Sequence, residues 1–517
     1  MRALISVYDK TGILELAKEL LNQGYEILSS GGTYAYLKNA GIDAIEVSEV
    51  TGFREILGGR VKTLHPAIHG GILFREDVEK DLEEIKENSI EPIDIVVVNL
   101  YPFEKKMKEL KDIDALIEFI DIGGPALVRA AAKNHKRVSV LTDVEDYGWF
   151  IEKLKMNAIS QKDRRYLALK AFWLTSYYDA VIANYFFKVF GFLEKDFKHH
   201  TIPMFLKDEL RYGENPHQQA YLYENPLEEN GIVRADVLQG KKMSYNNYLD
   251  ADSVIKLISE FSNPCCAIVK HNNPSGVATD DNLLEAYKKA FHCDPEAAFG
   301  GIVAFNRVVN KDIAKAIVEH FYEIIIAPDF TEEAVEEFSK KKNLRLVRYE
   351  NYNQRVDVRS ISGGFLLQDI DDKLYESIEV VSLRRPTEQE LEDAIFAWKV
   401  AKWTKSNAIV IAKNNQTIGI GAGQVSRVDS LRSAIRKAKN FGHDLKGAAV
   451  ASDAFFPFRD SIDIAAQEGI SGTIQPGGSI RDKEVIEAVN EHNMFMIFTH
   501  MRPVSYTHLT LPTNREV

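Results

Sequence analysis

Residues 265–276 read CCAIVKHNNPSG, and the two halves of this segment differ in character. The run CCAIV, preceded by Asn263-Pro264, is short and apolar and predicts a buried strand. Lys270 and His271 then stand side by side at the carboxyl end of that strand. Proline fixes φ and glycine tolerates positive φ, so NPSG at 273–276 predicts a turn directly afterwards. Ligands bind at the carboxyl ends of strands in open α/β sheets, and this segment therefore predicts a functional site.

For an isolated Lys-His pair, a surface lysine and a structural histidine would be the preferred interpretation. Further polar, glycine-rich strand ends along the chain argue against it. The chain has 517 residues, which predicts two to four domains, and its 45% hydrophobic and 27% charged residues are typical of a soluble globular protein. The net charge of −12 argues against a nucleic-acid binder.

The three cysteines form no C-x-x-C pair, so neither a disulfide framework nor a zinc ribbon is predicted. The first residues, MRALISV, predict a strand rather than a signal peptide. No apolar run approaches the roughly 20 residues that span a membrane. We therefore expect a cytoplasmic protein.

Short apolar strands alternate with helical patterns over residues 1–150. This alternation predicts βαβ units and a parallel, doubly wound sheet. The predicted strands are Leu4–Val7, Tyr25–Leu28, Ile42–Val47, Ile93–Val98 and Arg137–Leu141. Small residues at 30–33 (SGGT) stand between a strand and a helix, where backbone N–H groups can approach a phosphate. Residues 60–66 (RVKTLHP) add two cations, and 121–125 (DIGGP) opens another helix.

The second half repeats an order of strand, glycine-rich loop and helix from about residue 371, which predicts two related α/β subdomains. Its first loop, RYGENPHQ at 211–218, holds arginine, tyrosine and histidine and suits a phosphate and ring clamp. The loop GIGAGQ at 419–424 is by itself as consistent with a tight turn as with a nucleotide loop.

Six motifs together resemble a known family. They are SVYDKTG (6–12), SSGGT (29–33), GGRVKTLHPAIHGGIL (58–73), VVNLYPF (97–103), DIGGPALVRAAAKNH (121–135) and RYGENPHQ (211–218). The chain resembles the bifunctional purine-biosynthesis family that joins an inosine monophosphate (IMP) cyclohydrolase to an AICAR transformylase, over about residues 2–502. The resemblance implies a methylglyoxal-synthase-like cyclohydrolase with a helical connector (1–195) and a transformylase of two cytidine-deaminase-like α/β subdomains (203–370 and 371–502). Residues 503–517 depart from the family, look like foreign or read-through sequence, and are expected to be disordered or packed on the surface.

The implied cyclohydrolase closes formyl-AICAR to IMP when the carboxamide nitrogen attacks the formyl carbon and water leaves. Lys62 and Tyr101 suit the developing oxyanion. Asp121 paired with Lys133 suits the proton transfers. The resemblance also implies substrate-binding roles for Lys10, Ser30, Gly31, Gly32, Thr33, Arg60, Thr63, Asn99, Gly123 and Gly124. Tyr8 stands where many relatives have a serine.

The implied transformylase moves a formyl group from 10-formyltetrahydrofolate, its co-substrate, to the weakly nucleophilic amine of AICAR. His271 suits the general base, and Lys270 suits the tetrahedral oxyanion or the leaving group. Asn407 can donate a hydrogen bond to the formyl oxygen. The implied nucleotide and folate contacts are Arg211, Tyr212, Phe299, Gly300, Glu323, Arg427, Phe455, Asp460 and Arg502. The family further implies a homodimer whose transformylase sites draw on both subunits, and catalysis without a metal.

Two other classes of function are considered. A non-catalytic nucleotide sensor could use the same phosphate loops, but it would not need Lys62, Asp121, Lys270 or His271. A zinc deaminase would need the H-x-E and P-C-x-x-C signature, which is absent because Pro264-Cys265-Cys266 lacks the second spaced cysteine.

Overall fold

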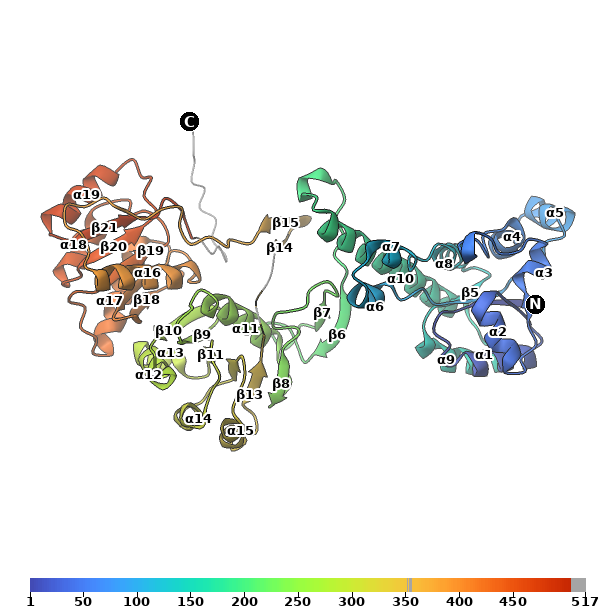
Figure 1. Cartoon of the computed structure of the whole chain (residues 1–517), viewed down its shortest axis with the longest axis horizontal. Coiled ribbons are helices and arrows are strands. Elements are labelled where there is room, and N and C mark those ends of the chain that lie inside the picture. The colour runs from blue at the N-terminus through green and yellow to red at the C-terminus, as the bar shows by residue number, and fades with distance from the viewer. Residues whose placement is uncertain (351, 353–355, 504–517) are drawn as a thin grey trace. The chain divides into compact units, whose positions relative to one another are not determined.

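The computed structural model describes residues 1–350, 352 and 356–503 (Figure 1). The chain forms two compact units, one of residues 1–205 with 225–227 and the other of the remaining residues. Of the atypical tail only Pro503 belongs to the described part, so the prediction for 504–517 lies outside it.

The first unit contains a five-stranded parallel sheet, in the strand order β3-β2-β1-β4-β5. Its strands are β1 (Arg2–Ser6), β2 (Glu26–Ser29), β3 (Ile45–Glu46), β4 (Ile95–Val98) and β5 (Ser139–Leu141). The parallel, doubly wound sheet is therefore confirmed. The strand predicted at Ile42–Val47 shrinks to two residues, because a capping box between Glu46 and Glu49 starts helix α3 (Val47–Thr51).

The remaining helices of this unit connect and cover the strands. They are α1 (Ile13–Asn22), α2 (Gly31–Asn39), η1 (Leu57–Gly59), α4 (Pro66–Leu73), α5 (Glu79–Glu87), α6 (Phe103–Glu109), α7 (Ile113–Ile117), α8 (Gly123–Lys133), η2 (Val144–Asp146), α9 (Tyr147–Lys155), α10 (Gln161–Phe190) and η3 (Glu194–Asp196). Helix α10 begins at a capping box of Ser160 and Asp163 and ends at Gly191. No helix among the described residues has the length and apolar character needed to span a membrane.

The second unit contains one twelve-stranded sheet, in the order β16-β21-β20-β19-β17-β18-β10-β9-β11-β12-β13-β8. Its strands are β8 (Asp236–Gln239), β9 (Cys265–Lys270), β10 (Asn273–Thr279), β11 (Ile302–Phe305), β12 (Ile324–Ala327), β13 (Arg345–Arg348), β16 (Glu379–Val380), β17 (Ile409–Lys413), β18 (Gln416–Gly421), β19 (Ala449–Ser452), β20 (Gly472–Gln475) and β21 (Phe495–Phe498). Two separate hairpins pair β6 (Phe205–Leu210) with β7 (Ala220–Glu224), and β14 (Val356–Ile361) with β15 (Gly364–Asp369).

This sheet consists of two halves of the same topology, joined where β10 pairs antiparallel with β18. Helix α11 (Tyr245–Ile258) precedes the hairpin β9–β10, and α16 (Glu388–Lys402) precedes the hairpin β17–β18. The order β10-β9-β11-β12-β13 in one half matches β18-β17-β19-β20-β21 in the other. The prediction of two related α/β subdomains is therefore confirmed.

Both faces of the sheet are buried, because successive residues of a strand point to opposite sides. Cys265, Ala267 and Val269 of β9 join a core that also includes residues of α11 and α16, and that spans both halves. The intervening Cys266 and Ile268 face a second core. On that side the first half is covered by α12 (Leu283–Cys293), α13 (Pro295–Ala298), α14 (Lys311–Val318) and α15 (Glu332–Phe338), and the second half by α17 (Arg427–Asn440), α18 (Asp460–Gln467) and α19 (Asp482–Glu491).

The prediction of a turn at residues 273–276 was wrong. Those residues form the start of β10, and the turn consists of His271 and Asn272, which both have positive φ (56° and 57°). Gly276 is required for packing rather than for a turn, because a Cβ there would lie 1.8 Å from the carbonyl oxygen of Ala290 in α12.

We expect Gly276→Ala to destabilise the second unit by roughly 1–3 kcal/mol or more, since the added methyl must push α12 away from β10. Gly364→Ala is the matched control, because a Cβ at Gly364 meets nothing within 4 Å. Urea unfolding followed by circular dichroism measures both variants. Equal midpoints for the two would contradict the packing role of Gly276.

Candidate active sites

The loops after β1 and β4 of the first unit meet at the carboxyl edge of the sheet. Crossovers leave this point in opposite directions, which is where open α/β sheets bind ligands. The Asn99 side chain joins the two loops, since its Oδ1 accepts from the backbone N–H of Tyr8 (2.5 Å) and Asp9 (3.0 Å) and its Nδ2 donates to the Asp9 carbonyl (2.8 Å). Asn99, which was predicted to contact substrate, thus also holds the two loops together.

Lys10 lies beside the N-terminus of α2. Its Nζ donates to Thr33 Oγ1 (3.1 Å) and to the carbonyl oxygens of Val7 and Tyr8. Burial lowers the pKa of Lys10, and Asp9 partly opposes that change. Ser30 precedes the helix without a side-chain capping bond, and Gly31 has φ +52°. The backbone N–H groups at the start of α2, the Ser30 hydroxyl and the Lys10 ammonium therefore lie close together, as a phosphate site requires.

Lys62 reaches the same helix end from the loop that follows η1. A Cβ on Gly31 would lie 3.2 Å from Lys62 Nζ, and a Cβ on Gly59 would lie 2.7 Å from Lys62 Cε. Glycine at 59 thus makes room for the lysine, whose Nζ lies 3.3 Å from Glu55 Oε2. Arg60, in the same loop, is exposed and forms an ion pair with Glu118.

Asp121 is the most enclosed charged group of this site. Its oxygens accept from the N–H of Gly124 (2.8 Å) and of Tyr101 (3.4 Å). Burial raises the pKa of Asp121, while these two N–H groups and the charge of Lys62 act in the opposite direction. Thr63 is buried, and a Cβ on Gly123 would lie 3.0 Å from its Oγ1, so the loops of Lys62 and Asp121 are packed together.

Lys133 is not brought to Asp121. It is exposed and stands in the last turn of α8, whereas Asp121 precedes the first. The eleven residues of α8 span roughly 16 Å, which exceeds the reach of a lysine side chain. The predicted Asp121–Lys133 pair is therefore not formed within the chain, and Lys62 is the cation that acts on Asp121.

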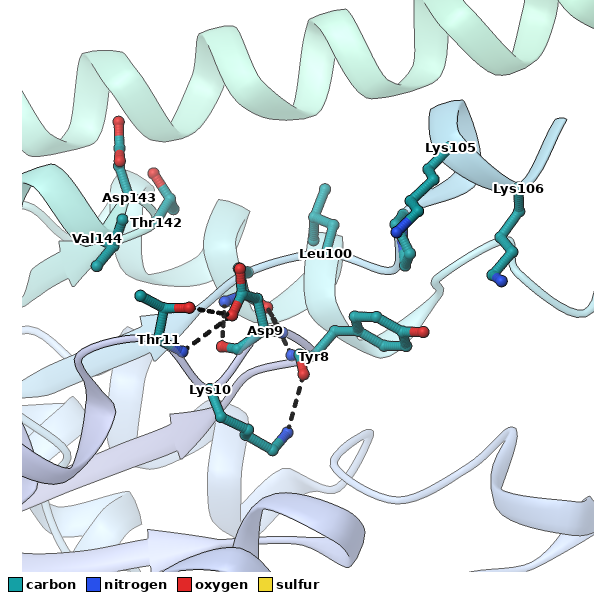
Figure 2. A pocket seen from close by; sticks show the side chains of 12 residues that line it. Tyr8, Asp9, Lys10, Thr11, Leu100, Lys105, Lys106, Thr142, Asp143 and Val144 are labelled. Carbon is teal, nitrogen blue, oxygen red and sulfur yellow. Dashed lines mark hydrogen bonds between the residues drawn. The ribbon is translucent and has the colours of Figure 1, made fainter. Parts of the chain in front are cut away.

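A cavity of about 600 Å³ opens beside these loops (Figure 2). Tyr8 lines it, and the Tyr8 ring meets Tyr101 edge to face, with centroids 5.7 Å apart. Sequence reasoning missed part of the lining, namely Lys105, Lys106, Thr142, Asp143 and Val144. In Figure 2, Lys105 and Lys106 lie at one end of the cavity and Asp143 and Val144 at the other. Position after a strand end is the signal that could have identified Thr142–Val144.

Sequence reasoning also missed Tyr178. Its hydroxyl donates to the Phe119 carbonyl (3.0 Å) and accepts from the Asp121 N–H (2.9 Å). The ring is buried with Phe103 and Leu116. The polar tip therefore fixes the loop that carries Asp121.

In the second unit, Asp250 of α11 fixes the turn of His271 and Asn272 through hydrogen bonds. The two carboxylate oxygens of Asp250 accept from the N–H of His271 (3.3 Å) and of Asn272 (2.7 Å). The His271 side chain is exposed, and Lys270 Nζ donates to the Phe299 carbonyl (2.8 Å). The predicted Lys-His pair thus projects from a rigid hairpin.

Asn407 comes to the same edge from the second half. Lys405 connects the halves, because its N–H donates to Asn273 Oδ1 (3.0 Å) and its Nζ to the His271 carbonyl (3.3 Å). Asn407 Nδ2 donates to the Gln424 carbonyl (2.9 Å), and its Oδ1 accepts from Arg427 (2.8 Å).

Arg427 is itself held by Asp453 (2.5 Å) and by Ser452 Oγ (2.7 Å). Arg427 is 9% exposed at its side chain and Asp453 is fully buried. This buried pair fixes the guanidinium that orients the Asn407 amide.

The other predicted residues of the first half lie at the amino ends of their strands. Phe299 and Gly300 precede β11, and Glu323 precedes β12. Because β11 runs antiparallel to β9 and parallel to β12, these amino ends lie at the same edge of the sheet as Lys270. Lys270 therefore stands at the carboxyl end of its strand, whereas these residues do not. Glu323 Oε2 accepts from Arg345 (2.7 Å), and the rings of Phe299 and Phe321 lie 5.2 Å apart.

Arg211 and Tyr212 follow β6 and form a cation–π pair at 5.5 Å. Their loop is connected to α11 through Asn246 Nδ2 and the Glu214 carbonyl (3.4 Å), one helical turn before Asp250. Arg502 is exposed after β21. Strands β19, β20 and β21 are parallel, so Phe455, Asp460 and Arg502 all follow strand ends at the edge that carries Asn407.

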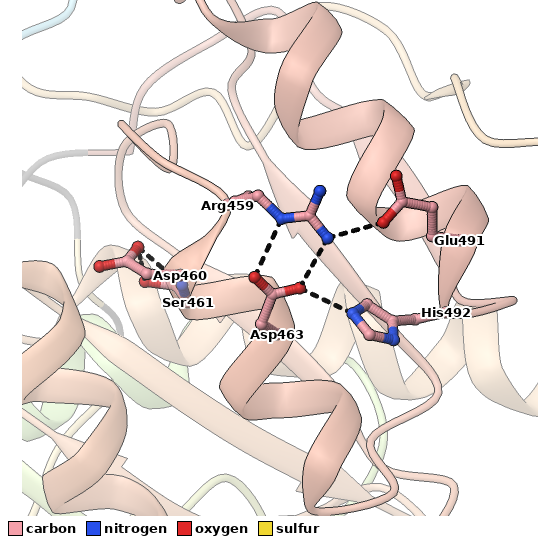
Figure 3. Close-up of polar contacts among 6 residues, drawn as sticks. All are labelled: Arg459, Asp460, Ser461, Asp463, Glu491 and His492. Carbon is pink, nitrogen blue, oxygen red and sulfur yellow. Dashed lines mark hydrogen bonds and ion pairs between the residues drawn. The ribbon is translucent and has the colours of Figure 1, made fainter.

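Asp460 stands at the start of α18, next to a charged cluster (Figure 3). Arg459 donates to both oxygens of Asp463 (3.0 and 3.1 Å) and to Glu491 (2.7 Å), and His492 Nε2 lies 2.7 Å from Asp463. Figure 3 shows the guanidinium between the two carboxylates. The bonds from Arg459 and His492 hold the pKa of Asp463 at about 2. The cluster anchors α18 and thereby the Asp460 backbone.

Among the described residues, no three or more histidine, cysteine, aspartate or glutamate side chains are grouped as a metal site. Two family models match the chain. A family model described as "MGS-like domain" matches residues 12–126, and one described as "AICARFT/IMPCHase bienzyme" matches residues 131–437.

Similar proteins match almost the whole chain. "Bifunctional purine biosynthesis protein PurH" of Aquifex aeolicus is 61% identical over 97% of this chain and 99% of its own length. The proteins of the same name from Persephonella marina and Caldicellulosiruptor saccharolyticus are 54% and 52% identical over the same shares. The chain belongs to the AICARFT/IMPCHase bienzyme family. It is a bifunctional enzyme of purine biosynthesis, an AICAR transformylase and IMP cyclohydrolase.

We expect Tyr178→Phe to slow ring closure by this bienzyme about tenfold, because the N–H of Asp121 and the Phe119 carbonyl lose a buried partner, at a cost of roughly 1–3 kcal/mol. Formyl transfer should be unchanged. Tyr177→Phe is the matched control, since the Tyr177 hydroxyl also extends from α10 but donates to Glu104 (2.7 Å). Steady-state rates of both half-reactions test this. A larger loss in Tyr177→Phe than in Tyr178→Phe would contradict it.

We expect Asp463→Asn to lower the unfolding free energy of the second unit by about 1 kcal/mol at pH 7, because the cluster is partly exposed. The folded-state pKa of Asp463 is depressed. Its contribution is therefore present above the ordinary pKa of aspartate and disappears as the pH falls from about 5 towards 2. Denaturant unfolding at pH 7 and pH 3.5 should show a shrinking difference from the parent chain. Glu484→Gln, which removes an exposed pair with Arg481, serves as control. A difference as large at pH 3.5 as at pH 7 would refute the assignment.

Proposed function

We propose that the first unit closes the ring of formyl-AICAR and that the second unit transfers the formyl group to AICAR. The observation that carries the proposal is the presence of two separate polar edges. One combines Lys10, Lys62 and Asp121, and the other combines Lys270, His271 and Asn407. Each edge offers a proton-transfer group and a cation to a substrate that needs both.

In the first unit, the N–H groups of α2 and the ammonium of Lys10 bind the nucleotide phosphate. Lys62 lies between this helix end and Asp121, so it can neutralise the oxyanion that forms when the carboxamide nitrogen attacks the formyl carbon. Asp121 has a raised pKa and therefore exchanges a proton more readily near neutral pH than an exposed carboxylate does. Tyr101 and Tyr8 form the aromatic wall of the site. The remaining contacts fall to Arg60, Thr63 and the glycines that begin α8.

In the second unit, His271 removes the proton from the amine of AICAR as that amine attacks the formyl carbon. Lys270 neutralises the tetrahedral oxyanion, and the Asn407 amide donates its remaining N–H to the same oxygen. Arg427 keeps that amide in place. The proton then passes from His271 to the folate nitrogen that leaves. These steps are proton transfers and charge neutralisation by side chains of the chain itself.

The formyl donor that we propose is 10-formyltetrahydrofolate. The exposed ring of Phe299 and the ring of Phe455 offer aromatic surfaces for the flat parts of the two substrates, and Arg211 offers a bidentate contact to a phosphate. We also propose a homodimer in the cytoplasm, because the family resemblance implies sites made from both subunits. Arg211, Tyr212 and Arg502 belong to segments that a second subunit could reach or supply.

Two variants separate the reactions. We expect His271→Ala to reduce formyl transfer 10²–10⁴-fold with ring closure unchanged. We expect Lys62→Met to reduce ring closure roughly 10²–10³-fold with formyl transfer unchanged. The assays start from AICAR with 10-formyltetrahydrofolate, and from formyl-AICAR alone, and follow tetrahydrofolate and IMP spectrophotometrically.

His199→Ala is a control for His271→Ala, because His199 is exposed in the segment that follows η3 and carries no proposed role. Loss of both reactions in either variant would contradict two separate sites. Nucleotide binding without either product in the parent chain would instead favour the sensor.

A further inference from the structure

The hairpin of β14 and β15 has no third strand among the described residues. The two strands pair antiparallel from Val356↔Asp369 to Ile361↔Gly364, around the two-residue turn of Ser362 and Gly363 (φ +83°). Isolated two-stranded hairpins are marginally stable in water and gain stability when another strand or a packed face is added. The hairpin is therefore incomplete as it stands.

Its side chains are unusually apolar for a surface element. Phe365, Leu366 and Leu367 of β15 are 76%, 57% and 45% exposed, and Ile361 and Val358 of β14 are 50% and 38% exposed. Because successive residues alternate between faces, both faces of the hairpin present apolar groups to water. Long apolar edge strands are templates for pairing with another chain.

The outer edge of β15 is the one available for such pairing. Residues that flank a two-residue turn form a hydrogen-bonded pair, so Gly364, Leu366 and Gln368 direct their backbone polar groups towards β14. Phe365 and Leu367 direct theirs outward. The β14 strand is different, because it carries Asp357 and Arg359, which form an ion pair at 2.9 Å, and charges protect an edge from pairing.

The sequence of β15 is complementary to itself. In an antiparallel pair centred on Leu366, Phe365 stands opposite the partner's Leu367, and Leu366 stands opposite the partner's Leu366. Phe365 and Leu367 then form hydrogen-bonded pairs through their outward backbone groups, and Leu366 forms the close, non-hydrogen-bonded pair. Residues 364–368 carry no charge, so no like charges meet.

We propose that β15 pairs with β15 of a second copy of this chain, which makes a four-stranded sheet across a two-fold axis. This inference rests on the homodimer proposed above and identifies the segment that joins its subunits. The interface is isologous, since each strand is both template and addition. It covers Phe365, Leu366 and Leu367 in both copies.

Disulfide formation tests the register. The Cα atoms of a non-hydrogen-bonded antiparallel pair lie about 4.5 Å apart, within the 4.4–6.8 Å that a disulfide accepts. Leu366→Cys should therefore join two chains of 58.5 kDa under mild oxidation. The native cysteines at 265, 266 and 293 are buried and burial raises the pKa of each thiol, so they do not compete.

Gln368→Cys is the matched control on the same exposed strand. In the proposed register its two copies lie roughly 14 Å apart, which is too far for a disulfide. Ile480→Cys places a fully exposed thiol elsewhere in the second unit and measures random collision. Non-reducing gels after dilution to low protein concentration compare the three variants, and light scattering of the reduced proteins reports the oligomeric state independently.

A cross-linked dimer from Leu366→Cys alone, at a yield independent of dilution, is the expected result. A reduced protein that is dimeric by light scattering but gives no disulfide at 366 would overturn the β15 pairing and leave the homodimer standing. Equal cross-linking at 366 and 368 would overturn the register and with it the proposal. A monomer would overturn both.

A second pair of variants tests the energetics. We expect Leu366→Lys to raise the dissociation constant of the dimer at least tenfold, since two like charges would face each other across the axis. Ile480→Lys should leave it unchanged. Both variants keep their secondary structure by circular dichroism if the substitution acts on the interface alone. An unaltered dissociation constant in Leu366→Lys would refute the pairing.

Discussion

The proposed transformylase site depends on one carboxylate, Asp250, which accepts hydrogen bonds from the N–H groups of two consecutive residues in left-handed conformation. Each such non-glycine residue costs roughly 1–2 kcal/mol, and hydrogen bonds to a charged group return roughly 1.5–3 kcal/mol each. The bonds thereby fix His271 at the tip of a buried hairpin. Lys405 then donates to the His271 carbonyl, which ties the second half to this point. The geometry that joins His271 to Asn407 follows from these contacts.

The same arrangement of a carboxylate and a left-handed turn occurs in the second half. Asp393 accepts from the N–H of Asn414 (2.9 Å) and of Asn415 (2.7 Å), both with positive φ. Asp393 precedes Lys413 by the same interval that separates Asp250 from Lys270. At this turn an asparagine replaces the imidazole, and Lys413 is paired with Asp444. The sheet thus has two equivalent turns, of which the first carries an imidazole and the second an asparagine side chain.

Much of this could be predicted from sequence. Apolar runs and glycine-rich loops predicted the parallel sheet, the strand ends and the repeated second half. The errors have physical causes. Asn, Pro and Gly at 273–276 have turn propensity, but Gly276 is there for the close approach of α12, which local sequence cannot reveal. Lys133 was paired with Asp121 by resemblance, although a helix of eleven residues separates them. The ring of Tyr178 is buried, and the position of its hydroxyl depends on a tertiary contact with the Phe119–Asp121 segment. The two halves of the second unit share the spacing of their Asp, Lys and Gly residues rather than a high sequence identity.

Three cations of the two proposed sites, Arg60, Lys62 and Arg427, have carboxylate partners, and the exposure of each pair decides what it can do. Arg60 and Glu118 are both more than half exposed, and such a pair contributes only about 0–1 kcal/mol, so a phosphate can replace the carboxylate at little cost. Lys62 and Glu55 are intermediate. Arg427 and Asp453 are buried, and removing either partner would leave an uncompensated charge. We therefore propose that Arg427 acts on substrate chiefly through Asn407, to which it donates a hydrogen bond, and that the exposed pairs exchange partners when a phosphate binds. In this way a chain with a net charge of −12 places paired cations at both proposed sites for anionic nucleotides.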